Sequence, residues 1–260
     1  MQIWRLIHTG NNNGYYNMAV DEAIAIAVRE GKVPSTLRFY TWDPPCISIG
    51  YFQKPDETLM SFVHQRDIVR RITGGRAVFH GNDLSYSVVS KTDNKLFPDT
   101  IKGTYTGIAK ALIAGLRNLG INPDPIEENP ELPNSRNTLS GKKYHKTHLC
   151  FNTTLGHEIT VKGKKLIGSA QRRWRDVFLQ HGSILINGLE SENGDSSISL
   201  RDCISDEVFP DKCNDFASLL SAGISAGFAQ TVGIQLSEGD LTRYESDLAE
   251  KLITGKYACL

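Results

Sequence analysis

The chain has 260 residues, in which 29 lysines and arginines are balanced by 29 aspartates and glutamates. A formal net charge of zero supplies no broad basic field, and this argues against nucleic acid as a partner. No stretch approaches the roughly 20 apolar residues of a membrane span, and the first residues lack a basic segment followed by an apolar run. We therefore expect a cytoplasmic protein without a membrane partner.

The cysteines are five in number, and none belongs to a C-x-x-C pair. An odd count without such pairs argues against both a disulfide framework and a zinc site. The histidines also lack the spacing of a metal-ligand set, so no metal is expected. Each cysteine is predicted to be a free thiol: Cys46, Cys150, Cys203, Cys213 and Cys259.

The first part of the chain predicts a strand, a helix and two further strands. Residues 2–7 read as a short strand, and apolar residues at helical spacing over 20–28 predict a helix that stops at Gly31. The stretches "TLRFYTW" and "CISIGYF" then alternate with a period of two on either side of Asp43-Pro44-Pro45. This pattern is typical of two strands joined by a tight turn.

The middle of the chain adds strands around a pair of glycines and a long helix. A short helix is expected around 56–65, and residues 67–90 read as strand, glycine turn, short strand and alternating strand. Apolar spacing over 108–119 predicts a second long helix that ends at Gly120. Residues 122–147 show no periodicity, so we expect a mobile segment there.

The last part begins with a hairpin that turns at Lys162-Gly163 and a strand over 176–188. Two helical stripes follow, over 217–228 and 241–252. Strands mixed with flanking helices predict an α+β fold with a mixed, largely antiparallel sheet. We expect residues 1–190 to form the core and residues 191–260 to be a mostly helical part packed on the same domain.

The sequence "RRITGGRAVFH", residues 70–80, surrounds two adjacent glycines with three arginines. Adjacent glycines allow positive φ and let the backbone approach a ligand closely. The spacing is neither a P-loop nor a Rossmann turn, because the terminal Lys-Ser/Thr and a following helix are absent. A bulged turn with solvated arginines and a site where arginines and amides contact phosphate both remain open.

Lys165 and Cys150 are the two residues whose combination suggests covalent chemistry. Taken singly, a strand lysine usually faces water and a lone cysteine is usually inert. A strict hairpin would pair Lys165 with Thr160 and leave Cys150 ten positions farther along, so residues 150–156 would have to fold back. An ammonium beside the sulfur would lower the thiol pKa and favour the nucleophilic thiolate. Nearby histidines are the alternative bases: His80, His148, His157 and His181.

Three motifs together resemble the catalytic domain shared by biotin and lipoate protein ligases and octanoyltransferases: "RRITGGRAVFH", "GKKLIGSAQRR" and "LQHGSILI". The resemblance covers about residues 3–190 and extends more loosely to the C-terminus. Cys150 in "HLCF", with "TGGRAVFHGNDLSYSVV", is similar to the LipM-type octanoyl-[acyl-carrier protein]:protein N-octanoyltransferases. Two features depart from that pattern: Ala77 stands where a relative carries glycine, and the polar segment 128–147 matches no motif.

The resemblance implies that Cys150 is the acyl-thioester nucleophile and that Lys165 lowers its pKa. It also implies octanoyl-acyl-carrier protein as donor, a lysine of a lipoyl-type domain such as glycine cleavage H protein as acceptor, and no cofactor. Substrate is expected to contact Arg71, Thr73, Gly74, Gly75, Arg76, His80, Gly168, Ser169, Ala170 and His181.

Three alternatives stay open. An ATP-dependent lipoate–protein ligase would use the lysine to hold an acyl-adenylate and would need no cysteine at this position. An octanoyl amidotransferase would move the group between two lipoyl domains. A carrier-protein binding module would keep the fold without needing Cys150.

Overall fold

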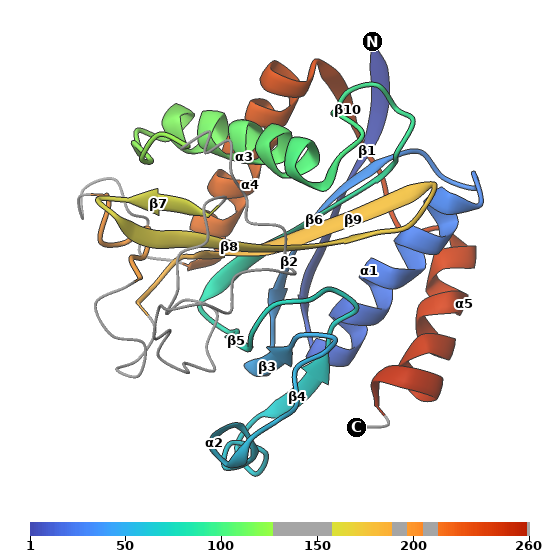
Figure 1. Ribbon diagram of the computed structural model, residues 1–260, viewed down its shortest axis with the longest axis vertical. Coiled ribbons are helices and arrows are strands. Elements are labelled where there is room, and N and C mark those ends of the chain that lie inside the picture. The colour runs from blue at the N-terminus through green and yellow to red at the C-terminus, as the bar shows by residue number, and fades with distance from the viewer. Residues whose placement is uncertain (127–157, 189–196, 205–212, 259–260) are drawn as a thin grey trace, which may run out of the picture.

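The structure is a computed structural model, and it describes residues 1–126, 158–188, 197–204 and 213–258 (Figure 1). The helices are α1 (Gly14–Arg29), α2 (Glu57–Met60), α3 (Ile101–Asn118), α4 (Cys213–Val232) and α5 (Arg243–Leu252), and a π-helical turn follows at Ile253–Tyr257. The strands are β1 (Gln2–Asn12), β2 (Thr36–Trp42), β3 (Cys46–Ile49), β4 (Asp67–Arg70), β5 (Val78–Phe79), β6 (Asp83–Lys91), β7 (Ile159–Val161), β8 (Lys164–Arg173), β9 (Val177–Leu185) and β10 (Ile234–Glu238).

A large sheet crosses the molecule in the order β10-β1-β2-β6-β9-β8-β7. Within the described strands, β1 pairs in parallel with β10 and β2, and the other four pairings of this sheet are antiparallel. A second sheet has the order β4-β3-β5. The predicted α+β fold with a mixed, largely antiparallel sheet is therefore confirmed.

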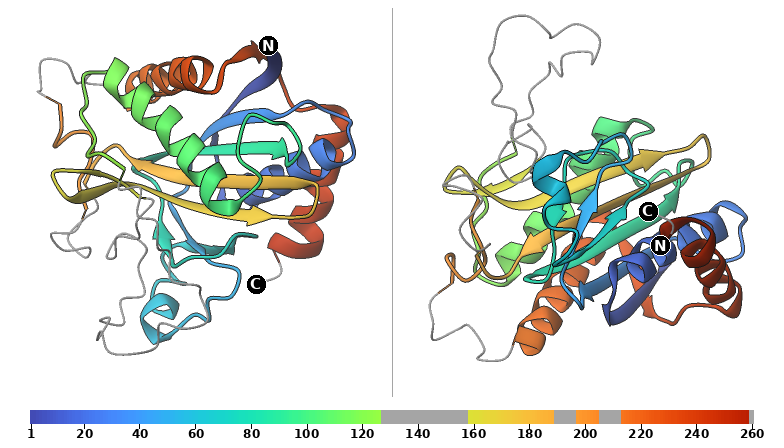
Figure 2. Two further views of the ribbon diagram at one scale, coloured as in Figure 1. Left: turned by 45° about the horizontal axis from the view of Figure 1, so that its top comes forward. Right: turned by 90° about the horizontal axis from the view of Figure 1, so that it is seen from below.

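Helices cover both faces of the large sheet. Helices α3 and α4 lie on one face, and α1 and α5 lie on the other (Figure 1). Each face has its own apolar core, built from alternate residues of the strands. Figures 1 and 2 both show the small sheet on the same side as α1, with which its strands β3 and β4 are in contact. A second layer of strands is thereby placed opposite one end of the large sheet.

Local sequence explains where several helices begin. Asn13 and Thr100 accept hydrogen bonds from the first-turn amides of α1 and α3, and Thr242 forms a capping box with Glu245 at the start of α5. Gly31 and Gly120 adopt positive φ just after α1 and α3, where the sequence predicted that both helices stop. No helix of the described part of the chain is long and apolar enough to cross a membrane.

Two long-range features differ from the sequence expectation. The strands on either side of Asp43-Pro44 exist, but β2 joins the large sheet and β3 joins the small one. The segment between them therefore connects two layers and does not close a hairpin. In addition, the C-terminal part supplies β10, which extends the large sheet beside β1. Neither pairing leaves a local pattern, because each depends on residues far away in the chain. The division at residue 190 stays a prediction.

Candidate active site

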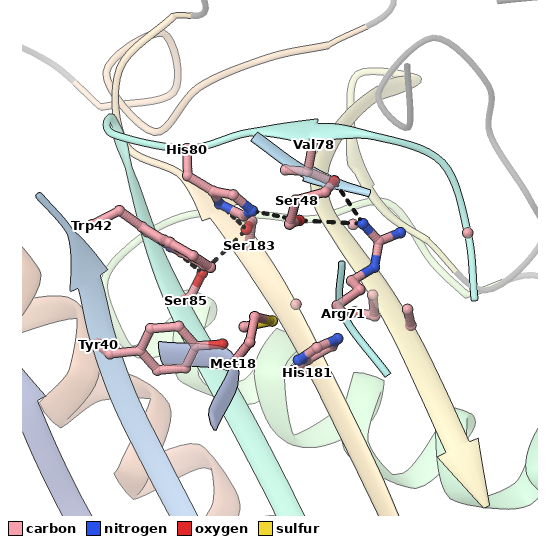
Figure 3. A pocket seen from close by; sticks show the side chains of 15 residues that line it. Met18, Tyr40, Trp42, Ser48, Arg71, Val78, His80, Ser85, His181 and Ser183 are labelled. Atoms are coloured by element: carbon pink, nitrogen blue, oxygen red, sulfur yellow. Dashed lines mark hydrogen bonds between the residues drawn. The ribbon is translucent and has the colours of Figure 1, made fainter. Parts of the chain in front are cut away.

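A cavity lies between the large sheet and the small sheet (Figure 3). Strands β2, β6, β8 and β9 line one side, β3, β5 and the glycine turn line the other, and α1 contributes Met18. The lining combines apolar side chains with small residues and a few polar groups, the composition that is typical of small-molecule sites. Its residues are Met18, Tyr40, Trp42, Ser48, Arg71, Gly75, Val78, His80, Ser85, Gly168, Ser169, Ala170, His181, Gly182 and Ser183.

Arg71 organises the glycine turn. Its guanidinium donates to the backbone oxygens of Ser48, Gly74 and Arg76 at 2.7–3.2 Å, and the side chain is buried. Gly75 adopts a φ of +95°, whereas Gly74 does not adopt positive φ. Gly50 is equally constrained, because a Cβ there would lie 2.0 Å from the oxygen of Gly75. The arginine that the sequence offered as a ligand group thus also shapes the wall of the cavity.

His181 links the floor of the cavity to the glycine turn. Its Nε2 lies 2.6 Å from Oγ1 of Thr73, and its Nδ1 lies 2.9 Å from Asp21, which forms an ion pair with Arg38. Burial lowers the pKa of His181, and the hydrogen bond that its ring donates to Asp21 only partly offsets this effect. Burial opposes ionisation of Asp21, but Arg38 and His181 outweigh it and lower the pKa of that carboxyl. His181 is therefore a neutral imidazole beside the Asp21 carboxylate.

His80 forms a second network of the same kind. Its Nδ1 lies 2.9 Å from Asp83, and its Nε2 lies 2.8 Å from Oγ of Ser48, which also accepts from Arg71 (Figure 3). The ring stacks on Trp42 at a centroid distance of 3.8 Å. Despite burial, interaction with His80 lowers the pKa of the Asp83 carboxyl. Both imidazoles are therefore fixed in orientation by a buried carboxylate.

Lys165 reaches the cavity side of the large sheet because β8 contains a bulge. Thr160 pairs with Lys165, as the sequence predicted, while Ile159 pairs with Ile167, so Leu166 is the extra residue. Leu166 and Ile167 both pack in the core beneath α3 and α4. Without the bulge, Lys165 would share that face with Ile167. With it, Lys165 lies on the face that carries Ala170 in the cavity wall.

Lys165 is completely buried. Its ammonium forms an ion pair with Glu158, which immediately precedes β7 and whose side chain is 9% exposed. Across the same hairpin, Asp124 receives hydrogen bonds from Thr160 and from the amides of the Lys162-Gly163 turn. The hydrogen bonds to Asp124 hold the turn of the hairpin in place, and the hairpin in turn positions Lys165.

The comparisons place the chain in a family. The family of the Lipoyl protein ligase A/B catalytic domain matches residues 13–198. A protein of Kyrpidia tusciae named Octanoyltransferase LipM is 37% identical over 275 residues, which cover 97% of this chain and 96% of the relative. Proteins of the same name from Moorella thermoacetica and Staphylococcus aureus are 38% and 35% identical, over 99% and 98% of this chain and 96% of each relative. The chain belongs to the LipM octanoyltransferase family. It is therefore an acyltransferase, and octanoyl transfer in lipoate biosynthesis is its activity.

The solved structures agree with this LipM assignment in fold. A lipoate–protein ligase A bound with ATP is 25% identical, with a TM-score of 0.75 over 100% of this chain and 97% of that one. A bi-partite lipoate protein ligase of Thermoplasma acidophilum is 22% identical, with a TM-score of 0.74 over 99% and 94%. The fold of this LipM-family chain is thus that of the lipoate ligases.

The sequence-predicted site residues of this LipM-family chain fall into three groups. The cavity wall contains Arg71, Gly75, His80, Gly168, Ser169, Ala170 and His181. Four are not in the wall: Thr73, Gly74 and Arg76, which lie in the glycine turn, and Lys165, which lies on the same face of the large sheet as Ala170. Cys150 lies outside the described residues.

The sequence analysis missed the rest of the wall and its carboxylates. Asp21 sits on α1 among apolar residues, and only its contacts with His181 and Tyr40 reveal a connection with the cavity. Gly182 lies where a Cβ would meet the oxygen of Gly168 at 2.6 Å and the ring of Tyr86 at 2.7 Å. The sequence signal that could have identified Gly182 was the "HG" pair in "LQHGSILI", where glycine interrupts a buried strand.

Of the other cysteines, Cys46 and Cys203 are free thiols in the structure. Burial raises the pKa of Cys46 well above its ordinary value and also raises the pKa of Cys203. Neither thiol is therefore activated. Within the described part of the chain, no group of three histidine, cysteine, aspartate or glutamate side chains could hold a metal ion.

Proposed function

We propose that the chain transfers octanoyl from octanoyl-acyl-carrier protein to Cys150, and then to a specific lysine of a lipoyl-type acceptor domain such as glycine cleavage H protein. The observation that carries the proposal is the cavity with Lys165 on its side of the sheet, in a chain that resembles LipM proteins along its whole length. Apolar residues such as Met18, Trp42 and Val78 suit an alkyl chain.

The reaction divides one acyl transfer into two. The Cys150 thiolate attacks the octanoyl carbonyl, a new thioester forms, and the thiol of the carrier's pantetheine arm leaves. The acceptor amine then attacks that thioester, an amide forms, and the cysteine thiol is released. The ammonium of Lys165 would lower the pKa of Cys150 in both steps. Backbone amides of Gly74-Gly75 or Gly168-Ser169 are the proposed donors to the oxyanion.

A second candidate is an ATP-dependent lipoate–protein ligase. The observation in its favour is the likeness to a ligase bound with ATP, which extends over the whole chain. In that reaction the acyl group would be activated as an adenylate, and Lys165 would hold the adenylate. The two functions differ in whether ATP is required and in whether the enzyme becomes acylated.

Intact mass spectrometry separates the candidates. The protein is mixed with octanoyl-acyl-carrier protein in the absence of ATP, and the transferase is expected to gain one octanoyl group that hydroxylamine removes. Cys150→Ala should not gain the group. Cys203→Ala is the matched control, because Cys203 is a free thiol without activation, and it should be acylated like the wild type.

Adding glycine cleavage H protein should then move the octanoyl group to a lysine of that protein. Octanoylation of the acceptor that requires ATP, without an acyl-enzyme, would establish the ligase. Transfer of octanoyl from an already modified lipoyl domain, but not from the carrier protein, would establish an amidotransferase.

A further inference from the structure

Glu158 is an acidic residue that has no direct role in the proposed acyl transfer. It lies just before β7, on the opposite arm of the hairpin from Lys165, and its carboxylate forms an ion pair with the lysine ammonium. Lys165 has no accessible surface, and the Glu158 side chain is 9% exposed. The contact is therefore largely withdrawn from water.

Burial makes the charge of Lys165 dependent on its surroundings. Taking an ammonium out of water favours the neutral amine and can lower the pKa of a lysine by about 3–5 units when nothing compensates. A carboxylate in contact opposes that loss, because it favours the charged form. Since only the charged form can stabilise a thiolate, the protonation state of Lys165 decides what the residue can do.

Among the residues that the structure describes, two other carboxylates near the hairpin have partners of their own. Asp124 accepts hydrogen bonds from the amides of Lys162 and Gly163. Asp202 accepts hydrogen bonds from the amide and the hydroxyl of Ser199. Lys164, the neighbour of Lys165, is exposed. Glu158 is thus the carboxylate that the described contacts assign to Lys165.

We propose that Glu158 is a positioning residue that keeps Lys165 protonated, so that the lysine acts as a fixed cation and not as a base. This inference rests on the proposed function for its catalytic meaning, because the cation serves the Cys150 thiolate. It goes further by assigning the charge of Lys165 to a particular partner. The short hairpin gives that partner a fixed place, since Thr160 and Lys165 are paired across it.

The test is to titrate Lys165 itself. In Cys150→Ala protein labelled at the lysine side chains, the Lys165 signal is assigned by its loss in Lys165→Met and followed by NMR between pH 6 and 10. Glu158→Gln is expected to let Lys165 lose its proton at lower pH, because the buried ammonium then lacks its carboxylate. Glu158→Asp should restore most of the shift. Glu57→Gln, a change of an exposed glutamate in α2, should leave the titration unchanged.

An unchanged Lys165 titration in Glu158→Gln would overturn the proposal. Should that variant fail to fold, the wild-type titration decides, because a Lys165 that loses its proton below about pH 9 is not held as a cation. In protein that retains Cys150, Glu158→Gln should also raise the pH at which iodoacetamide alkylates this thiol. The titration needs no acyl transfer, so a failed acyl-enzyme assay would reject the proposed function and leave the assignment of Glu158 intact.

Discussion

The glycine turn and the hairpin each bury one cation, but they compensate it differently. Arg71 in the turn donates to neutral backbone oxygens at 2.7–3.2 Å and to the Ser48 hydroxyl. Lys165 in the hairpin meets the carboxylate of Glu158. The guanidinium is always charged and offers five donors in a fixed fork, whereas a buried ammonium can lose its proton. Arg71 therefore stabilises the backbone of the turn, whereas Lys165 is a cation whose charge depends on its neighbour Glu158.

The largest expected effect on stability follows from replacing Arg71. Arg71→Met would leave the oxygens of Ser48, Gly74 and Arg76 without this donor in a buried place. Unpaired buried acceptors cost about 1–3 kcal/mol each, so we expect the free energy of unfolding to fall by about 3–4 kcal/mol. Urea denaturation followed by circular dichroism measures it. Arg175→Met, at an exposed position, should change the value by less than about 0.5 kcal/mol.

The matched change in the hairpin removes Lys165 together with its carboxylate. Replacing both members of a buried ion pair is often neutral, so Lys165→Met with Glu158→Gln should stay within about 1 kcal/mol of the wild-type stability. Acyl transfer should nevertheless be lost. If this double variant were as unstable as Arg71→Met, the distinction between a structural role for Arg71 and a functional role for Lys165 would be wrong.

A smaller effect should separate the two glycines of the turn. Gly75 has a φ of +95°, and a Cβ there would lie 2.7 Å from Nη2 of Arg71, so Gly75→Ala should cost about 1–3 kcal/mol. Gly74 lacks positive φ and has open space around it, so Gly74→Ala should stay within about 0.5 kcal/mol. Thermal unfolding of the two variants side by side makes the comparison. Equal losses would show that the turn does not depend on its left-handed residue.

The smallest effect concerns pH and the buried imidazole of His181. The pKa of His181 is lowered in the folded protein, so between that value and about 6.5 the unfolded chain binds more protons. Stability should therefore fall as pH drops below about 6.5, by at most about 1.4 kcal/mol per pH unit for this one group. The lowered pKa of Asp21 adds a further loss only below about pH 4. His181→Gln should remove the upper part of this dependence, and denaturation midpoints at pH 7.5 and 5.5 would show whether it does.

Much of the secondary structure was predictable because its causes are local. The period of apolar residues gave α1, α3, α4 and α5, and glycines marked the ends of α1 and α3. The Lys162-Gly163 turn fixed the register that pairs Thr160 with Lys165, since a two-residue turn determines which residues face one another. The substrate-contact residues that the family resemblance implied include seven of the fifteen residues in the cavity wall.

By itself, then, the sequence determined the fold class, the family and the identity of the residues that belong together in the motifs. Only the tertiary structure decided that β2 and β3 part into two sheets with a cavity between them, and that Asp21 of α1 reaches His181. It also decided that a bulge at Leu166 turns Lys165 toward the cavity side. The physical reason is that a buried charge takes its partner from whichever element packs against it, and strand pairing and bulges set that contact between residues far apart in the chain.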